Sequence, residues 1–112
     1  MQYALLIYGS PDRLDGARPL DPTVATVLAR PSVSGWARLH AAASATTVRV
    51  EEGRTLLTDG PFIDSKEFLA GVVLVEADDL DGALEIAHQL QETRTRGAIE
   101  VRPILQGCLG GA

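Results

Sequence analysis

Short apolar runs alternate along this chain with two stretches that have helical periodicity. Residues 2–8 form a near-continuous apolar run, which predicts a central β-strand covered on both faces. A helix is predicted to begin at Asp21-Pro22, because a capping carboxylate followed by proline is typical of a first helical turn. Its apolar positions recur at spacings of three and four, at Val24, Val27 and Leu28. Pro31 is expected to end it.

The middle of the chain reads as strands. Residues 35–39 predict a short strand, and residues 45–50 alternate between apolar and polar side chains. Residues 51–54 have glycine late in a tight turn, so the chain is expected to return along residues 55–58 as a hairpin. After an acidic turn, residues 69–76 form a second strongly apolar strand.

The second helix has the clearest pattern in the sequence. Either Asp78 or Asp79 is expected to cap it, and Gly97 is expected to end the segment. Residues 98–104 then predict a last strand. The apolar stripe of the helix consists of Leu80, Ala83, Leu84, Ala87 and Leu90.

This order of elements predicts an α+β fold of the ferredoxin-like β-α-β-β-α-β type with an extra β-hairpin. We expect one domain over residues 1–104 and a Gly-rich C-terminal tail over residues 105–112. Two helices on one face of such a sheet leave the other face bare. A second copy of the chain is the simplest cover, so we expect a homodimer through the open sheet face.

Composition narrows the classes of partner. The 112 residues are 46% hydrophobic and carry a net charge of −5, and the arginines are scattered, so we expect no nucleic-acid partner. No window is long and apolar enough to predict a membrane span or a signal peptide. The single cysteine, Cys108, cannot close an intrachain disulfide, which favours a cytoplasmic protein.

One motif resembles a known family. The stretch Thr58-Asp59-Gly60-Pro61-Phe62, followed by Lys66-Glu67 and an apolar strand, is similar to the YCII-related family in its DGPF-domain branch. The resemblance implies a ferredoxin-like fold of the dimeric α/β-barrel type. It also implies a relation to small lyases and isomerases for which a His–Asp active-site pair has been proposed. Some members of the family are linked to sigma-factor systems.

On this resemblance the catalytic candidates are His40 and Asp59. An imidazole oriented by a carboxylate is a general base that changes its charge near neutral pH. For Asp59, a purely structural role in the turn is an equal alternative, because aspartate before Gly-Pro accepts bonds from nearby backbone N–H groups. For His40, the alternative is an exposed or capping histidine.

Three further residues are candidates for ligand binding. Lys66 is the only lysine, and together with Arg38 it is suited to hold an anionic group. Tyr8 ends the first strand and is either a pocket hydroxyl or a core tyrosine. We expect no cofactor, and two histidines without a cysteine partner make a structural zinc site improbable. The odd residue nearby is Trp36, which either lines the cavity or plugs it.

These residues support two classes of function and do not decide whether the protein is an enzyme. The first is a small cofactor-free lyase or isomerase, in which His40 is the base, Asp59 orients it, and Arg38 or Lys66 holds an anionic ligand. The alternative is a non-catalytic dimeric ligand-binding or regulatory interaction module associated with sigma factors. A dimer whose ancestral site has decayed is a third reading, and the unusual residues 34–38 favour it slightly.

Overall fold

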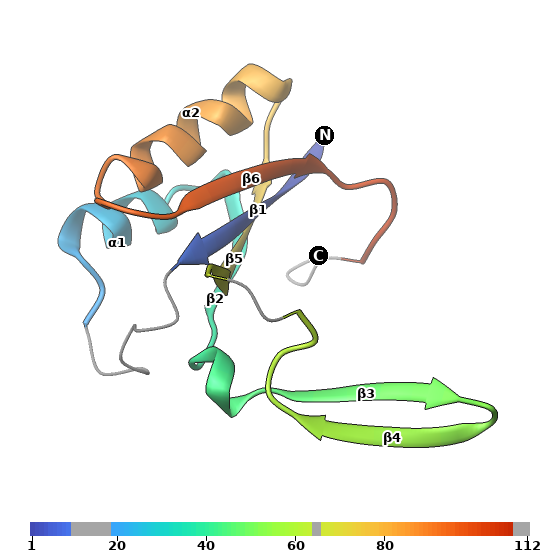
Figure 1. The fold of residues 1–112 in the computed structure, drawn as a ribbon. Helices are drawn as coiled ribbons and strands as arrows, with labels where there is room; N and C mark the ends of the chain where they lie inside the picture. Colours follow the sequence, from blue (N-terminus) through green and yellow to red (C-terminus); the bar gives the residue numbers. More distant parts are fainter. Residues whose placement is uncertain (10–18, 64–65, 109–112) are drawn as a thin grey trace.

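The computed structural model describes residues 1–9, 19–63 and 66–108. The order of its elements follows the predicted alternation, while most of the loop expected before Asp21 lies outside the described residues. The elements are β1 (Gln2–Gly9), α1 (Pro22–Leu28), β2 (Val33–Arg38), the 3-10 helix η1 (Ala42–Ser44), β3 (Thr46–Glu51), β4 (Arg54–Asp59), β5 (Phe68–Glu76), α2 (Leu80–Gln91) and β6 (Ala98–Pro103) (Figure 1).

Four strands form one antiparallel sheet in the spatial order β2-β5-β1-β6. Both helices lie on the same side of this sheet (Figure 1). The protein is therefore a mixed α+β fold with two helices and a mostly antiparallel sheet, compatible with the predicted ferredoxin-like plan. Among the described residues, no helix is long and apolar enough to cross a membrane.

The hydrophobic core lies between the sheet and the helices. Because side chains alternate across a strand, every second residue of β1 and β5 points into it, and Leu5 and Val75 are completely buried. From α2 the predicted stripe contributes Ala83, Ala87 and Leu90. Two stripe positions lie elsewhere, since Leu80 and Leu84 are exposed at 48% and 44%. The buried face of α2 is therefore turned relative to the predicted stripe, away from Leu80 and Leu84 and toward Ile86, which the stripe did not include.

Both helices begin at an aspartate. The Asp21 carboxylate accepts a hydrogen bond from the Thr23 amide at 2.8 Å, with Pro22 as the first helical residue, as predicted. At the second helix the sequence left two candidates open. The structure selects Asp79, whose carboxylate accepts from the Gly82 amide at 3.0 Å.

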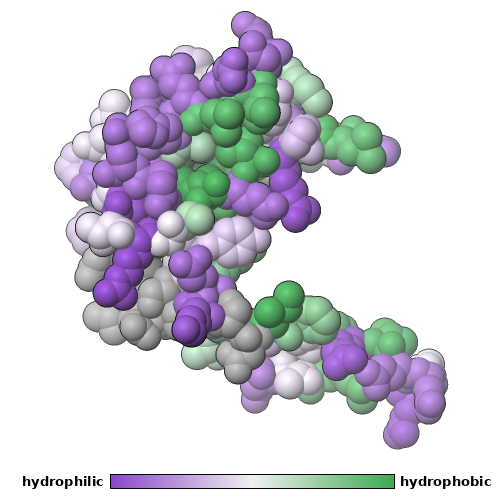
Figure 2. Space-filling model, turned by 45° about the horizontal axis from the view of Figure 1, so that its top comes forward, coloured by the Kyte–Doolittle hydropathy of each residue, from purple (hydrophilic) through white to green (hydrophobic). Residues whose placement is uncertain are grey.

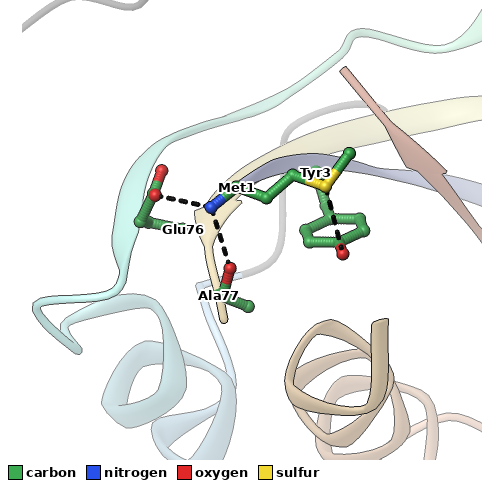
Figure 3. A network of polar contacts seen from close by, with 4 residues as sticks. All are labelled: Met1, Tyr3, Glu76 and Ala77. Carbon is green, nitrogen blue, oxygen red and sulfur yellow. Dashed lines mark hydrogen bonds and ion pairs between the residues drawn. The ribbon is translucent and has the colours of Figure 1, made fainter. Parts of the chain in front are cut away.

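The first strand is also secured at its N-terminus. The amino group of Met1 donates to the Glu76 carboxylate at 2.9 Å and to the Ala77 carbonyl at 3.0 Å (Figure 3). The Tyr3 hydroxyl lies 3.6 Å from the sulfur of Met1. These contacts join the start of β1 to the end of β5. The Met1–Glu76 ion pair is more than half exposed, so we assign it well under 1 kcal/mol.

The face of the sheet that points away from the helices is apolar at its centre. The residues of β1 and β5 that alternate with the core positions lie on it, and the central ones are Ala4, Leu6, Val72 and Leu74. At its β6 edge, Arg102 donates to the Glu100 carboxylate at 2.9 Å. This hydrogen bond and the charge of Glu100 raise the pKa of the Arg102 guanidinium. We call this surface the open sheet face.

Strands β3 and β4 form a separate two-stranded sheet that projects from the body as an arm (Figure 1). The hairpin predicted from the sequence is confirmed, with Glu51 paired to Arg54 across a two-residue turn. Both turn residues have positive φ, 51° at Glu52 and 77° at Gly53, as a type I′ turn requires. We use "the arm" for residues 46–59.

Candidate functional site

A large cavity lies on the helix side of the sheet, with a volume of about 1000 Å³. The core face supplies apolar lining from both layers, including Ile7, Leu28, Val73, Leu90 and Ile99. Polar lining residues come from four places in the chain: the cap of α1, the end of β2, the segment that follows β2, and the turn after α2. A cavity with an apolar wall and a few converging polar groups is the usual form of a small-molecule site.

Arg38 lies in the lining because β2 ends there. It pairs with Gly71 of β5, and a Cβ added at Gly71 would lie only 2.9 Å from the Ala37 carbonyl oxygen. Glycine at this position therefore lets the two strands approach where the cavity opens. Trp36, two residues earlier on the same face, also lines the cavity and is 47% exposed. It lines the space rather than filling it.

His40 lies just after β2 and is exposed. It lines the large cavity and also a smaller hollow of about 340 Å³ at the root of the arm. The two share lining residues on both sides of His40, and Pro61 borders the smaller one. The structure thus places Arg38 and His40, which the sequence singled out, at one cavity.

The structure does not bring Asp59 to that cavity. Asp59 ends β4, where it pairs with Thr46, and it is not among the described residues that line either space. The catalytic pair stays a prediction.

The motif around Asp59 has a clear role in local geometry. The Gly60 amide donates to the Ala45 carbonyl at 2.7 Å, and the Thr47 hydroxyl donates to the Gly60 carbonyl at 2.8 Å. Gly60 has φ +99°, a conformation that favours glycine. These bonds close the root of the arm, so the turn sets the direction in which the arm leaves the body.

The other two predicted ligand-binding residues lie outside the described lining of the cavity. The Tyr8 hydroxyl is 3.5 Å from the Glu100 carboxylate, a residue of the open sheet face. Lys66 is exposed in the segment that leads into β5. Their roles in binding stay predictions.

Two arginines of the lining were not recognised as site residues from the sequence. Arg94 and Arg96 follow α2, where cations are favoured by the helix dipole, and that was the only signal they gave. The Arg94 guanidinium donates to the Tyr8 carbonyl at 2.6 Å and to Gln91 Oε1 at 3.1 Å. Arg96 is exposed at the cavity.

The described lining has more positive than negative groups. It contains Arg38, Arg94 and Arg96, whereas its one described carboxylate is Asp21, which already caps α1. Nowhere in the described part of the chain do three or more His, Cys, Asp or Glu side chains gather in a way that could hold a metal ion. The chemistry that these residues offer is binding of an anionic group and proton exchange at His40.

Comparison with known proteins establishes the family. A sequence model of the YCII-related domain matches residues 1–106. The chain belongs to the YCII-related domain family. The resemblance of the motif at Thr58 to Phe62 is therefore confirmed at the level of the family.

One relative is similar to this YCII-related chain over part of its length. It is an uncharacterised protein of Rhizobium meliloti (strain 1021), 41% identical over 69 residues. The match covers 61% of this chain and 56% of the relative. The chain thus spans about half the length of the curated relative that it matches, and that relative contributes no activity or ligand.

Proposed function

We propose that this YCII-related protein binds a small molecule with an anionic group and an apolar body in the cavity of about 1000 Å³. The observation that carries the proposal is the combination of an apolar wall with arginines at two places on the rim. Arg38 comes from the end of β2 and Arg96 from the turn after α2. A guanidinium binds a carboxylate through two parallel hydrogen bonds, while the apolar wall accepts the rest of the ligand.

His40 is the group that would exchange a proton with the bound molecule. Its imidazole lines the same cavity as Arg38, and histidine changes its charge near neutral pH. In the enzymatic form of the proposal, His40 accepts a proton from a C–H group next to a carbonyl. This is the first step of the lyase or isomerase reactions that the family resemblance implies. The orienting group in this form of the proposal is the Asp59 carboxylate.

The binding test uses phenylpyruvate, a keto acid with an apolar body, as the probe. We expect its addition to shift the amide signals of residues 36–42 and 93–96 in ¹H–¹⁵N spectra. Arg38→Met and Arg96→Met should each weaken binding about tenfold, whereas Arg54→Met at the tip of the arm should leave it unchanged. The proposal is wrong if phenylpyruvate, benzoate and a small lactone all leave these signals unmoved at millimolar concentration.

Catalysis has a separate readout. Phenylpyruvate exchanges the hydrogens next to its carbonyl with D₂O, and a base in the cavity would accelerate this exchange. We expect the acceleration to be lost in His40→Gln and retained in His88→Gln, because His88 is exposed on α2. If phenylpyruvate binds but its hydrogen exchange is not accelerated, the protein is a ligand-binding module and the enzyme hypothesis is rejected.

We also propose that the chain forms a homodimer through the open sheet face, in the manner of a dimeric α/β barrel. Ala4, Leu6, Val72 and Leu74 support this proposal, because they present apolar side chains away from the helices in the middle of the sheet. Sedimentation velocity at several protein concentrations tests it. A sedimentation coefficient of a monomer throughout would reject the dimer and leave the cavity proposal standing.

A further inference from the structure

The arm is amphipathic, and its apolar side is exposed. The paired register places Val48 directly opposite Leu57, with Val50 next to them on the same face by the two-residue period of a strand. Their exposed fractions are 63%, 69% and 68%. The opposite face carries charged groups, including Arg49, which pairs with Glu51 at 2.6 Å. We call the side with Val48, Val50 and Leu57 the apolar face of the arm.

None of the described residues covers this face, since Val48, Val50 and Leu57 are each at least 63% exposed. The arm is a separate two-stranded sheet, and neither of its strands pairs with the main sheet. An isolated two-stranded hairpin is marginally stable in water. A pattern with one apolar face is expected where that face packs against another surface, so the arm has the sequence of a packed hairpin without its partner.

The body offers a matching surface across a hollow. Figure 2 shows the arm standing away from the body, with hydrophobic side chains along the arm and on the flank of the body that borders the gap. The open sheet face is a second unpartnered apolar surface of the same chain, with Leu6, Val72 and Leu74 at its centre. One molecule therefore carries two apolar surfaces that no described segment of the same chain covers.

We infer that the arm docks onto a second copy of this chain and that its apolar face packs against the body of that copy. This inference rests on the homodimer proposed above and adds an interface that the open sheet face alone does not supply. In a two-fold dimer each chain gives one arm and receives one, so that the arm of each copy is covered by the body of the other.

The apolar area of the arm can be compared with the area that a stable protein dimer buries. At exposures of 63% to 69%, the three residues of the apolar face present on the order of 300 Å² of apolar surface. A stable dimer buries about 800 Å² on each partner. The apolar face of the arm alone falls short of this value, so in a dimer the proposed contact through the open sheet face would have to supply the rest of the buried area.

The charge of the arm is also compatible with contact between two copies of this chain. The arm contains Arg49 and Arg54 against Glu51, Glu52 and Asp59, so it carries a net charge of −1 in a chain of net charge −5. Two copies of such a chain repel on average, and contact through a nearly neutral segment of mixed sign keeps that repulsion small. The arm has no strong charge of one sign that would complement a strongly acidic or strongly basic partner.

Docking at the arm would affect the candidate site. The smaller hollow at the root of the arm is bordered by Pro61 and also by His40, which lines the main cavity. A body packed against the arm therefore covers one approach to His40. We expect the second copy to complete the wall of the site on this side.

The first experiment measures the dimer dissociation constant by sedimentation. Leu57→Asp places a charge on the apolar face, and Thr58→Asp places the same charge on the next residue, which points to the opposite face. We expect Leu57→Asp to raise the constant tenfold or more and Thr58→Asp to change it less than about threefold. Both positions are exposed, and far-UV circular dichroism confirms that each variant is folded.

The second experiment locates the contact. A spin label on Val50→Cys, in a Cys108→Ser background, is mixed with ¹⁵N-labelled chain that carries no label. We expect intermolecular broadening of amide signals in β2 or β6, the edge strands of the main sheet, outside the central residues that the proposed sheet-to-sheet contact covers. A label at Arg54→Cys on the other face should broaden them less.

The two experiments distinguish failure of the proposed arm contact from failure of the proposed homodimer. A wild-type chain that stays monomeric overturns both the homodimer and this inference. A wild-type dimer whose dissociation constant is the same in Leu57→Asp, or whose mixed sample shows no broadening on the sheet, overturns the docking of the arm and retains the sheet-to-sheet dimer.

Discussion

Arg94 is tied to Tyr8 across most of the length of the chain. Its guanidinium, in the turn after α2, donates to the backbone carbonyl at the end of β1 at 2.6 Å, and it also donates to Gln91 Oε1. The Gln91 amide in turn donates to the Gly97 carbonyl at 3.0 Å. This network holds the turn after α2 against the central strand and so positions one side of the cavity.

We expect Arg94→Met to lower the free energy of unfolding by about 1.5–3 kcal/mol, because the Tyr8 carbonyl would lose a charged, partly buried donor. Arg96→Met is the matched control, since Arg96 is exposed two residues away, and it should change stability by less than about 0.5 kcal/mol. Urea unfolding followed by circular dichroism measures both. Equal effects of the two changes would show that the bond to Tyr8 has no structural role.

Gly97 is required by the same network. Its φ is +82°, and an added Cβ would overlap the Tyr8 carbonyl oxygen and lie 2.6 Å from Arg94 Nη2. Gly53 has a similar φ of +77° but open space around it. We expect Gly53→Ala to cost about 1–2 kcal/mol from the backbone alone and Gly97→Ala to cost clearly more. Thermal unfolding compares them, and a smaller cost at Gly97 would contradict the packing described for this turn.

The cap of α2 gives a prediction at neighbouring residues. Asp79→Ala removes the acceptor of the Gly82 amide and should destabilise the protein by about 1 kcal/mol. Asp78→Ala removes the same charge one residue earlier and should have an effect below about 0.5 kcal/mol. Chemical denaturation of the two variants at one salt concentration decides between them, and a larger loss in Asp78→Ala would assign the cap to the wrong residue.

Substitutions at the neighbouring residues Leu5 and Leu6 distinguish the stability of the fold from the stability of the proposed dimer. Leu5 is completely buried between sheet and helices, so Leu5→Ala should lower the free energy of unfolding by about 2–5 kcal/mol at any protein concentration. Leu6 lies on the open sheet face, and Leu6→Ala should mainly weaken the proposed dimer. Its unfolding midpoint should therefore differ from that of the wild type more at high than at low protein concentration. A deficit independent of concentration would argue against burial of Leu6 between copies.

Much of the fold could be predicted because its signals are local. The turn at Glu52-Gly53, the cap at Asp21-Pro22 and the alternation of β1 and β5 each depend on residues within a few positions of one another. Periodicity predicted the position of α2 but not all of its buried residues, because the predicted stripe included Leu80 and Leu84, which are exposed. Which face of the helix is buried depends on the surface that the helix meets, and that surface comes from distant segments.

The site was only partly accessible from the sequence. Arg38 and His40 were identified, and they line one cavity because β2 ends beside β5. The expectation that a hairpin could bring Asp59 to His40 depended on the direction of the arm. The hydrogen bonds at Gly60 send the arm away from the body, and no pattern in the chain encodes that direction.

The sequence by itself therefore determined the elements, their order, the helix caps, the hairpin turn and the family, because each of these rests on local geometry or on a contiguous motif. Only the tertiary structure decided which residues share the cavity, that Arg94 and Arg96 belong to it, and that the arm projects with its apolar face exposed. The cavity depends on the pairing of β1 with β5 and β6, which joins residues up to about a hundred positions apart, and the direction of the arm depends on the hydrogen bonds at Gly60.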